Sequence, residues 1–222
     1  MTGGIYQQGA TTSAAYTTAV LKVTAPCYTS APIVPFQGQM SASTLQLASF
    51  AVNGQFITLQ GDADTSGSTL AGTYNTSGGC QGTTNGKFTA QRYTTLSGNY
   101  AGTPAGSIGQ RIAVQLQQST NPTGDGTFLL TGNAVLTGFT CFSSATLNTG
   151  DATISGDAVT LALTANDTQQ SRIMLNGTVD VAGKNITVSA GQIVGGSCAG
   201  NLGALILTST SAKRYRHQKA QA

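Results

Sequence analysis

The chain has 222 residues, enough for one large β domain or for two domains of about 100 residues each. Charged residues make up only 8% of it and Glu and Trp are absent, so Thr, Ser, Asn, Gln and Gly must cover the surface, as in many exported β proteins. Residues 1–212 carry six Lys or Arg against seven Asp, and the net charge of +3 comes from four basic residues in the segment 213–219. This near-neutral body excludes the clustered basic surface that nucleic-acid binding requires.

Short segments that alternate apolar and polar residues run between clusters of Gly, Asn, Asp and Ser, a pattern that predicts strands along the whole chain. No segment keeps a helical period long enough for a helix. The predicted fold class is therefore all-β: two tandem antiparallel meander units, each a small lipocalin-like barrel or a sandwich. A β-solenoid is the rival, but it would repeat every 20 to 30 residues or so.

We expect a first β unit over residues 1–95, a second over 96–211, and a disordered basic tail over 212–222. If residues 4–6 open the first unit as residues 98–100 open the second, the first unit lacks about one hairpin before its first cysteine. A repeat truncated at its N-terminus, or a start codon inside a longer gene, would give this pattern.

The two units correspond at an offset of 116 residues. The matching segments are 45–47 with 161–163, 57–59 with 173–175, and 64–67 with 180–183. This spacing predicts an internal repeat of one β unit.

Eight strands are predicted in the second unit, at 97–102, 110–118, 126–136, 140–155, 157–165, 171–180, 184–194 and 203–210. The turns between them contain Gly126, Gly156 and Gly183, which supply the positive φ angles that tight hairpins demand.

Two cysteines fall in each unit, and the correspondence between the units favours disulfides joining Cys27 to Cys80 and Cys141 to Cys198. Four buried free thiols are the alternative. A zinc site is disfavoured because no C-x-x-C pair occurs and the single histidine, His217, lies in the tail.

Disulfides predict an oxidising compartment, so we expect a secreted or cell-envelope protein of the periplasm or cell surface, although residues 1–25 contain no signal peptide. No run of 18 apolar residues occurs, which excludes a transmembrane helix.

Few residues could act as catalytic acids or bases, because Glu is absent and the acidic residues are seven scattered Asp. We expect no catalytic residue and no cofactor; an Asp-based hydrolase using Asp62 and Asp64 is a minor alternative. The segment from Asp62 through Asp64 and Ser66 to Gly67 resembles the start of a calcium loop, but Thr73 stands where such a loop needs Glu. An ordinary Asp and Gly turn is the preferred interpretation.

Residues 72–80 (GTYNTSGGC), 86–90 (GKFTA) and 96–102 (LSGNYAG) contain a G-x-Y opening strand and a G-G-C-x-G turn before the last strand. With these motifs the chain resembles poorly characterised exported bacterial β-repeat proteins, many of them lipoproteins. This resemblance implies export or attachment to the envelope and carries over no catalytic residue. The second unit departs from it at residues 191–193, and no lipobox cysteine lies near residue 1.

We therefore expect a non-enzymatic exported or cell-envelope β module with a structural, adhesive or protein-binding role. An envelope protein or polysaccharide is the expected partner. The alternative is a lipocalin-like carrier of a small apolar ligand, with a cavity of roughly 300 Å³ or more. Tyr74, Tyr100, Phe128 and Phe139 could line such a cavity, although core packing is the more common role for aromatic residues in strands.

Overall fold

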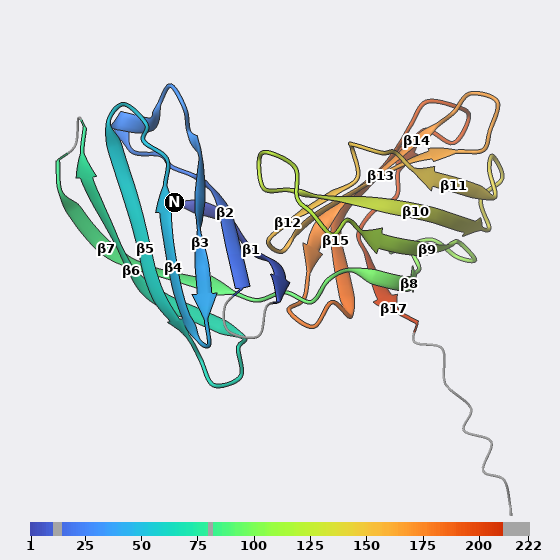
Figure 1. Ribbon diagram of the computed structural model, residues 1–222. Coiled ribbons are helices and arrows are strands. Elements are labelled where there is room, and N and C mark those ends of the chain that lie inside the picture. Colours follow the sequence, from blue (N-terminus) through green and yellow to red (C-terminus); the bar gives the residue numbers. More distant parts are fainter. Residues whose placement is uncertain (11–14, 80–81, 211–222) are drawn as a thin grey trace, which may run out of the picture.

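A computed structural model describes residues 1–10, 15–79 and 82–210 of the chain (Figure 1). Two antiparallel sheets contain all of its strands, and one 3-10 helix, η1 (Pro26–Tyr28), lies in the first half. The predicted all-β class is confirmed. The expected basic tail lies outside the described residues, as does Cys80.

The first sheet is an open half-barrel of seven strands that follow one another in chain order. They are β1 (Thr2–Ala10), β2 (Ala15–Lys22), β3 (Ile33–Ser41), β4 (Thr44–Ser49), β5 (Gln55–Ala63), β6 (Thr69–Gly78) and β7 (Thr84–Gln91). Among the described strands, β1 and β7 each pair on one side only, so they form the two edges of the sheet.

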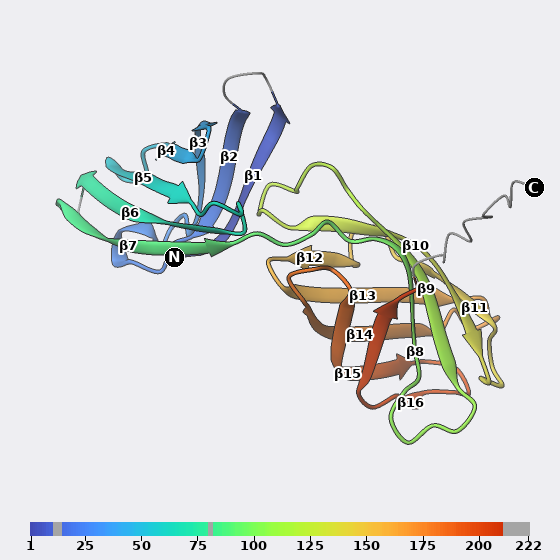
Figure 2. The same cartoon turned by 90° about the horizontal axis from the view of Figure 1, so that it is seen from below.

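The second sheet closes into an eight-stranded barrel. Its strands are β8 (Ser97–Gly102), β9 (Arg111–Gln118), β10 (Phe128–Thr137), β11 (Ser144–Leu147), β12 (Thr153–Ser155), β13 (Ala158–Ala165), β14 (Arg172–Val179), β15 (Asn185–Val194), β16 (Gly200–Asn201) and β17 (Leu205–Ser209). β11 and β12 share one place between β10 and β13, and β16 is a short addition to β15. Closure comes from β8, which pairs with β17 on one side and with β9 on the other (Figure 2).

One predicted strand, 140–155, is divided into β11 and β12. The division follows from a turn in which the carbonyl oxygen of Asn148 accepts hydrogen bonds from the backbone N–H groups of Asp151 and Ala152. Positive φ angles occur as predicted at Gly126, Gly156 and Gly183. In the first sheet, Asn53 and Gly54 have φ angles of 51° and 73°, the conformation of a tight two-residue hairpin.

Alternating side chains from each sheet build a separate core. The first core contains eleven buried residues, from Ala19 on β2 to Leu59 on β5. The second fills the barrel with side chains from β8 to β17, including Leu116, Leu130, Leu161 and Leu207, none of which is more than 1% exposed. The barrel interior is therefore occupied by the protein's own side chains.

Part of the first sheet has the same pairing register as the corresponding part of the barrel. Asp62 stands opposite Ala71 as Thr178 stands opposite Thr187, which matches the offset of 116 residues expected from the sequence. One strand earlier the offset differs, because Leu45 stands opposite Gly61 as Val159 stands opposite Gly177. Pairing therefore relates Leu45 to Val159 and not to Leu161. The reason is that the chain from Val159 to its partner Gly177 is two residues longer than the chain from Leu45 to its partner Gly61.

The structure also changes the match that the sequence suggested between residues 4–6 and residues 98–100. Residues 4–6 lie on β1, which pairs with β2 as β9 pairs with β10, so they take the place of β9 and not of residues 98–100 on β8. Within residues 1–10, 15–79 and 82–210, no strand of the first sheet takes the place of β8, so the difference from the barrel is one strand and not a hairpin.

Candidate functional site

Two rows of uncharged side chains cross the outer face of the first sheet. Cross-strand pairing aligns Tyr16, Gln39, Gln46 and Gln60 in one row, and Gln37, Ala48, Thr58 and Asn75 in the next. Their strand neighbours Leu47 and Leu59 are buried in the core, so strict alternation points the two rows outward. We call these eight residues the amide face.

The amide face lines an open hollow of about 660 Å³. No lining residue carries a charge, and Tyr16, on its border, keeps 47% of its surface exposed. Each amide can both donate and accept hydrogen bonds, and the tyrosine ring offers a flat apolar surface. The hollow can therefore bind a neutral ligand that is rich in hydroxyl groups.

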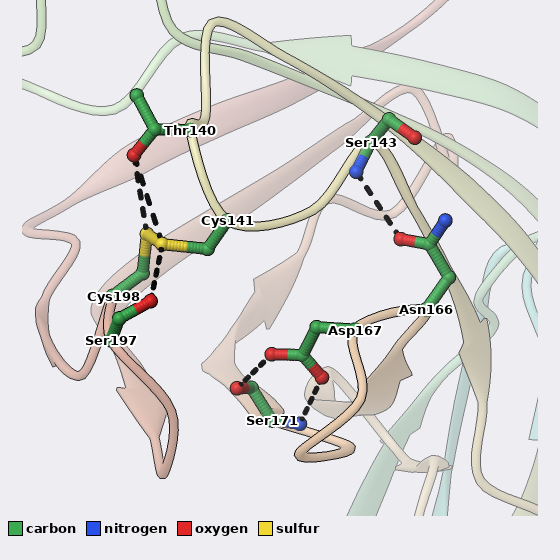
Figure 3. The surroundings of a disulfide bond; sticks show 8 residues. All are labelled: Thr140, Cys141, Ser143, Asn166, Asp167, Ser171, Ser197 and Cys198. Atoms are coloured by element: carbon green, nitrogen blue, oxygen red, sulfur yellow. Dashed lines mark hydrogen bonds between the residues drawn. A yellow bond between two sulfur atoms is a disulfide. The ribbon is translucent and has the colours of Figure 1, made fainter.

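A second, smaller hollow of about 290 Å³ lies beside the disulfide of the barrel. Cys141 and Cys198 are joined with a Cα–Cα distance of 6.0 Å, which confirms this predicted pair (Figure 3). The hydroxyl of Ser197 donates to the sulfur of Cys141 over 3.3 Å, and the Thr140 hydroxyl lies 3.7 Å from the same sulfur. Cys27 is also disulfide-bonded, and its predicted partner Cys80 lies outside the described residues.

The polar groups around this disulfide serve the loops that meet there (Figure 3). The side-chain oxygen of Asn166 accepts hydrogen bonds from the backbone N–H groups of Ser143 and Ser144, each over 3.2 Å. The carboxylate of Asp167 accepts from both the hydroxyl and the N–H of Ser171, and these bonds lower the pKa of Asp167 below its ordinary value. Both side chains fix loop conformation.

The calcium candidates Asp62, Asp64 and Ser66 have separate roles. Asp62 accepts the Thr44 hydroxyl over 2.6 Å on the outer face, whereas Asp64 holds the β5–β6 turn. The Asp64 carboxylate accepts hydrogen bonds from the hydroxyls of Ser66, Ser68 and Thr69 and from the N–H of Ser68. Desolvation acts to raise the pKa of Asp64, but these bonds together outweigh it and hold the pKa well below its ordinary range. Within the described residues, no group of three or more metal-ligating side chains comes together.

The four aromatic residues considered as cavity lining lie apart. Tyr100 is 2% exposed in the barrel core, and its hydroxyl donates to the carbonyl oxygen of Gly183 over 2.7 Å. Phe128 meets Tyr6 edge to face at 5.7 Å between ring centroids. Phe139 stacks on Phe142 at 5.3 Å beside the disulfide, and Tyr74 packs against the core of the first sheet. They do not form a common pocket.

Sequence reasoning missed the amide face. Its signal was present, because Gln37 and Gln39 are two residues apart and alternate with core residues, as Gln46 and Gln60 do on the next strands. Only the pairing register shows that these side chains stand in rows.

No protein-family profile matches the chain, and no curated protein or solved structure matches it. Among the residues the structure describes, no helix is both long and apolar enough to cross a membrane.

Proposed function

We propose that this chain is a non-enzymatic module of the exported or cell-envelope class, and that it adheres to neutral polysaccharide through the amide face. One observation carries this proposal: rows of uncharged amide and hydroxyl side chains that line an open hollow beside an exposed tyrosine.

The chemistry of the hollow suits sugar hydroxyls. A hydroxyl group both donates and accepts hydrogen bonds, and Gln39, Gln46 and Gln60 offer both functions side by side on adjacent strands. The ring of Tyr16 gives the apolar face of a sugar a surface to stack on. Because the lining is uncharged, a neutral glycan fits it better than an anionic one.

Two features support an exported location. The disulfide between Cys141 and Cys198 fits an oxidising compartment. The charged fraction of 8% suits a surface that is solvated by Thr, Ser, Asn and Gln. The resemblance to exported β-repeat proteins favours a more specific form of this proposal, in which the protein is attached to the envelope as a lipoprotein.

The packed interior of the barrel favours an adhesive module over a carrier. An eight-stranded barrel is just wide enough for its own side chains to fill or for one small ligand. Here Leu116, Leu161 and Leu207 are at most 1% exposed and point into the centre, where an apolar ligand would otherwise lie.

Retention on insoluble polysaccharide tests the proposal. Purified protein is mixed with a neutral glucan, a neutral mannan and an anionic uronan, and the bound fraction is measured at low and high salt. We expect retention on a neutral polymer that high salt leaves unchanged, because no charge is involved.

Variants locate the binding surface. Tyr16→Ala and the double change Gln46→Ala with Gln60→Ala should each weaken retention at least tenfold, equivalent to about 1.4 kcal/mol. Gln115→Ala, at an exposed position on β9 of the barrel, is the matched control and should bind as the unchanged protein does. Lack of retention on both neutral polymers, or equal losses in all three variants, would reject the proposal.

A further inference from the structure

Two phenylalanines of the first sheet are exposed to solvent. Phe50 directly follows β4 and Phe56 lies on β5, and they keep 53% and 47% of their surface exposed. They belong to one short hairpin, which turns at Asn53 and Gly54. Single exposed apolar residues are normal on a protein surface, whereas neighbouring ones mark a binding surface. This pair therefore calls for a ligand.

Both rings point to the same side of the sheet as the amide face. Burial alternates without a break along β5, so Phe56 points outward with Thr58 and Gln60. The same alternation turns Ala48 outward on β4, and Phe50 follows it by two residues. The phenylalanines thus form a third row on the outer face, about 7 Å along the strands from the second row of the amide face.

The third row has one covered end. The N–H of Phe50 donates to the carbonyl oxygen of Pro35 over 3.4 Å, and Pro35 stands opposite Val20 on β2. Val20 is buried, and Gly126 from the β9–β10 loop of the barrel lies against it. Among residues 1–10, 15–79 and 82–210, none covers Phe50 or Phe56 to the same extent.

The phenylalanine row and the hollow of the amide face form one continuous surface. Ala48 and Thr58 both line the hollow, and each is two residues from a phenylalanine. Ala48 is the smallest side chain of the amide face, so no bulky group separates the hollow from Phe50. A ligand in the hollow can therefore reach the rings without passing a charged side chain.

The arrangement of β4 and β5, which run side by side in Figure 1, gives this surface a direction. On both strands the outward positions run from an amide through a small side chain to a phenylalanine. These positions are Gln46, Ala48 and Phe50 after and on β4, and Gln60, Thr58 and Phe56 on β5. From amide to ring the distance is about 14 Å along the strands, roughly the length of three sugar units in an extended chain.

A straight neutral glycan matches this order of side chains. A sugar ring carries hydroxyl groups on its edge and C–H groups on its faces, so amides bind the edge and aromatic rings bind a face. Hexoses joined by β-1,4 linkages form a straight ribbon, whereas α-1,4 linkages coil the chain. Extended strands offer a straight track, which favours the ribbon.

We propose that Phe50 and Phe56 form an aromatic subsite of the glycan site, and that the ligand is a neutral β-1,4-linked chain of about three sugar units or more. The chain lies along β4 and β5. Sugars at one end bind Gln46 and Gln60, and a sugar at the other end stacks on the phenylalanine rings. This inference rests on the proposed function, since it adds a direction, a length and a linkage to the same site.

A length series of soluble oligosaccharides tests the subsite. Chains of β-1,4-linked glucose or mannose, from the disaccharide to the hexasaccharide, are titrated into the full chain by calorimetry. We expect the affinity for one of the two sugars to rise about tenfold from the disaccharide to the tetrasaccharide and then to level off, because only the longer chain reaches the rings. The α-1,4-linked glucose series should show no such gain.

Variants show whether the rings cause the gain. Phe50→Ala combined with Phe56→Ala should remove it and leave disaccharide binding unchanged, a split that a general loss of structure would not produce. Phe50→Trp combined with Phe56→Trp should keep the gain, because a larger ring also stacks on sugar. Ile206→Ala, at an exposed position on β17 of the barrel, is the matched control and should change neither affinity.

Three results would overturn the subsite: a gain that survives the loss of both rings, equal losses for the short and long chains, or equal gains for the β- and α-linked series. Sedimentation with anionic phospholipid vesicles and ultracentrifugation of the protein alone test two other occupants. Vesicle binding or dimers that only the alanine variant loses, with glycan binding intact, would assign the rings to lipid or to a second copy.

The same experiment separates this inference from the proposed function. If the unchanged protein binds neither the oligosaccharides nor the insoluble neutral polymers, the proposed function fails and the subsite fails with it. If the protein is retained on a neutral polymer and the alanine variant is retained equally, only the subsite fails.

Discussion

The open sheet and the closed barrel use the same local pairing and reach different cores. β5 and β6 pair in the register of β14 and β15, and both turns between them are held by an aspartate, Asp64 or Asp180. The barrel then gains β8, and its inward side chains become almost fully buried.

Closure, and not strand sequence alone, therefore decides how much apolar surface each strand buries. Phe88 and Leu205 occupy equivalent positions in the two sheets, because Phe88 stands opposite Gly72 as Leu205 stands opposite Val188. The larger side chain is the less buried of the two, because β7 pairs on one side only among the described strands, whereas β17 pairs with both β15 and β8. Four changes would break or sharpen this comparison.

Removal of the barrel disulfide should have the largest effect. Cys141 and Cys198 are 57 residues apart, and cross-linking a loop of that length stabilises a fold by about 4 kcal/mol in the chain-entropy model. Replacing both by Ser should lower the stability of the barrel by that order and leave the first sheet unchanged. Urea unfolding followed by hydrogen exchange resolves the two units, and equal losses in both would show that they unfold together.

Truncation of the core side chains at the matched positions 205 and 88 should have the second-largest effect on stability. Leu205→Ala should cost about 3 kcal/mol, because it removes a buried leucine from a packed interior. Phe88→Ala should cost only about 1 to 2 kcal/mol, because its ring already contacts water. The same unfolding assay gives both values, and a larger loss for Phe88 would mean that the first core is covered in solution.

Tyr100→Phe should destabilise the barrel by about 1 kcal/mol, because it leaves the Gly183 carbonyl without its buried donor. Tyr16→Phe is the control, since Tyr16 is 47% exposed, and it should change stability little. If the two variants are equally stable, the hydrogen bond of Tyr100 contributes nothing to closure.

Acid should affect both units through their aspartate turns. Hydrogen bonding from the Lys184 N–H lowers the pKa of Asp180, and hydrogen bonds from Ser68 and Thr69 outweigh desolvation to lower that of Asp64. A lowered folded-state pKa stabilises the fold above the unfolded value of about 4, and this stabilisation is lost as the pH falls below it. Asp64→Asn and Asp180→Asn should each make the fall in melting temperature between about pH 4 and pH 2 slightly shallower in their own unit.

Much of the fold could be predicted from the sequence, because alternation and turn residues act locally. The prediction of 97–102 matches β8, and 184–194 matches β15 within one residue, where Gly183 and Gly195 with positive φ angles flank the strand. The internal repeat and the domain boundaries stay predictions. The pairing register nevertheless corrects two comparisons. At Leu45, two extra residues between paired positions of the second sheet move the match without altering the alternation. At residues 4–6, the strand takes the place of β9 and not of β8.

The candidate sites were less accessible to sequence reasoning. Cys141 and Cys198 could be paired by their positions in corresponding units, but Tyr16, Gln39 and Gln60 are far apart in the chain and meet only through cross-strand pairing. The calcium-like segment could be recognised in the sequence. In the structure, however, Asp62 and Asp64 accept hydrogen bonds from different partners.

The sequence by itself determined the strand class, most strand limits, the turn positions and the near-neutral surface, because these depend on residue type and on a period of two. Only the tertiary structure decided that one sheet closes while the other stays open, since closure depends on which distant strands pair. The same long-range pairing aligns the amide face and leaves β1 and β7 as edges. The amide face therefore arises from how the strands are assembled and from no single segment of the chain.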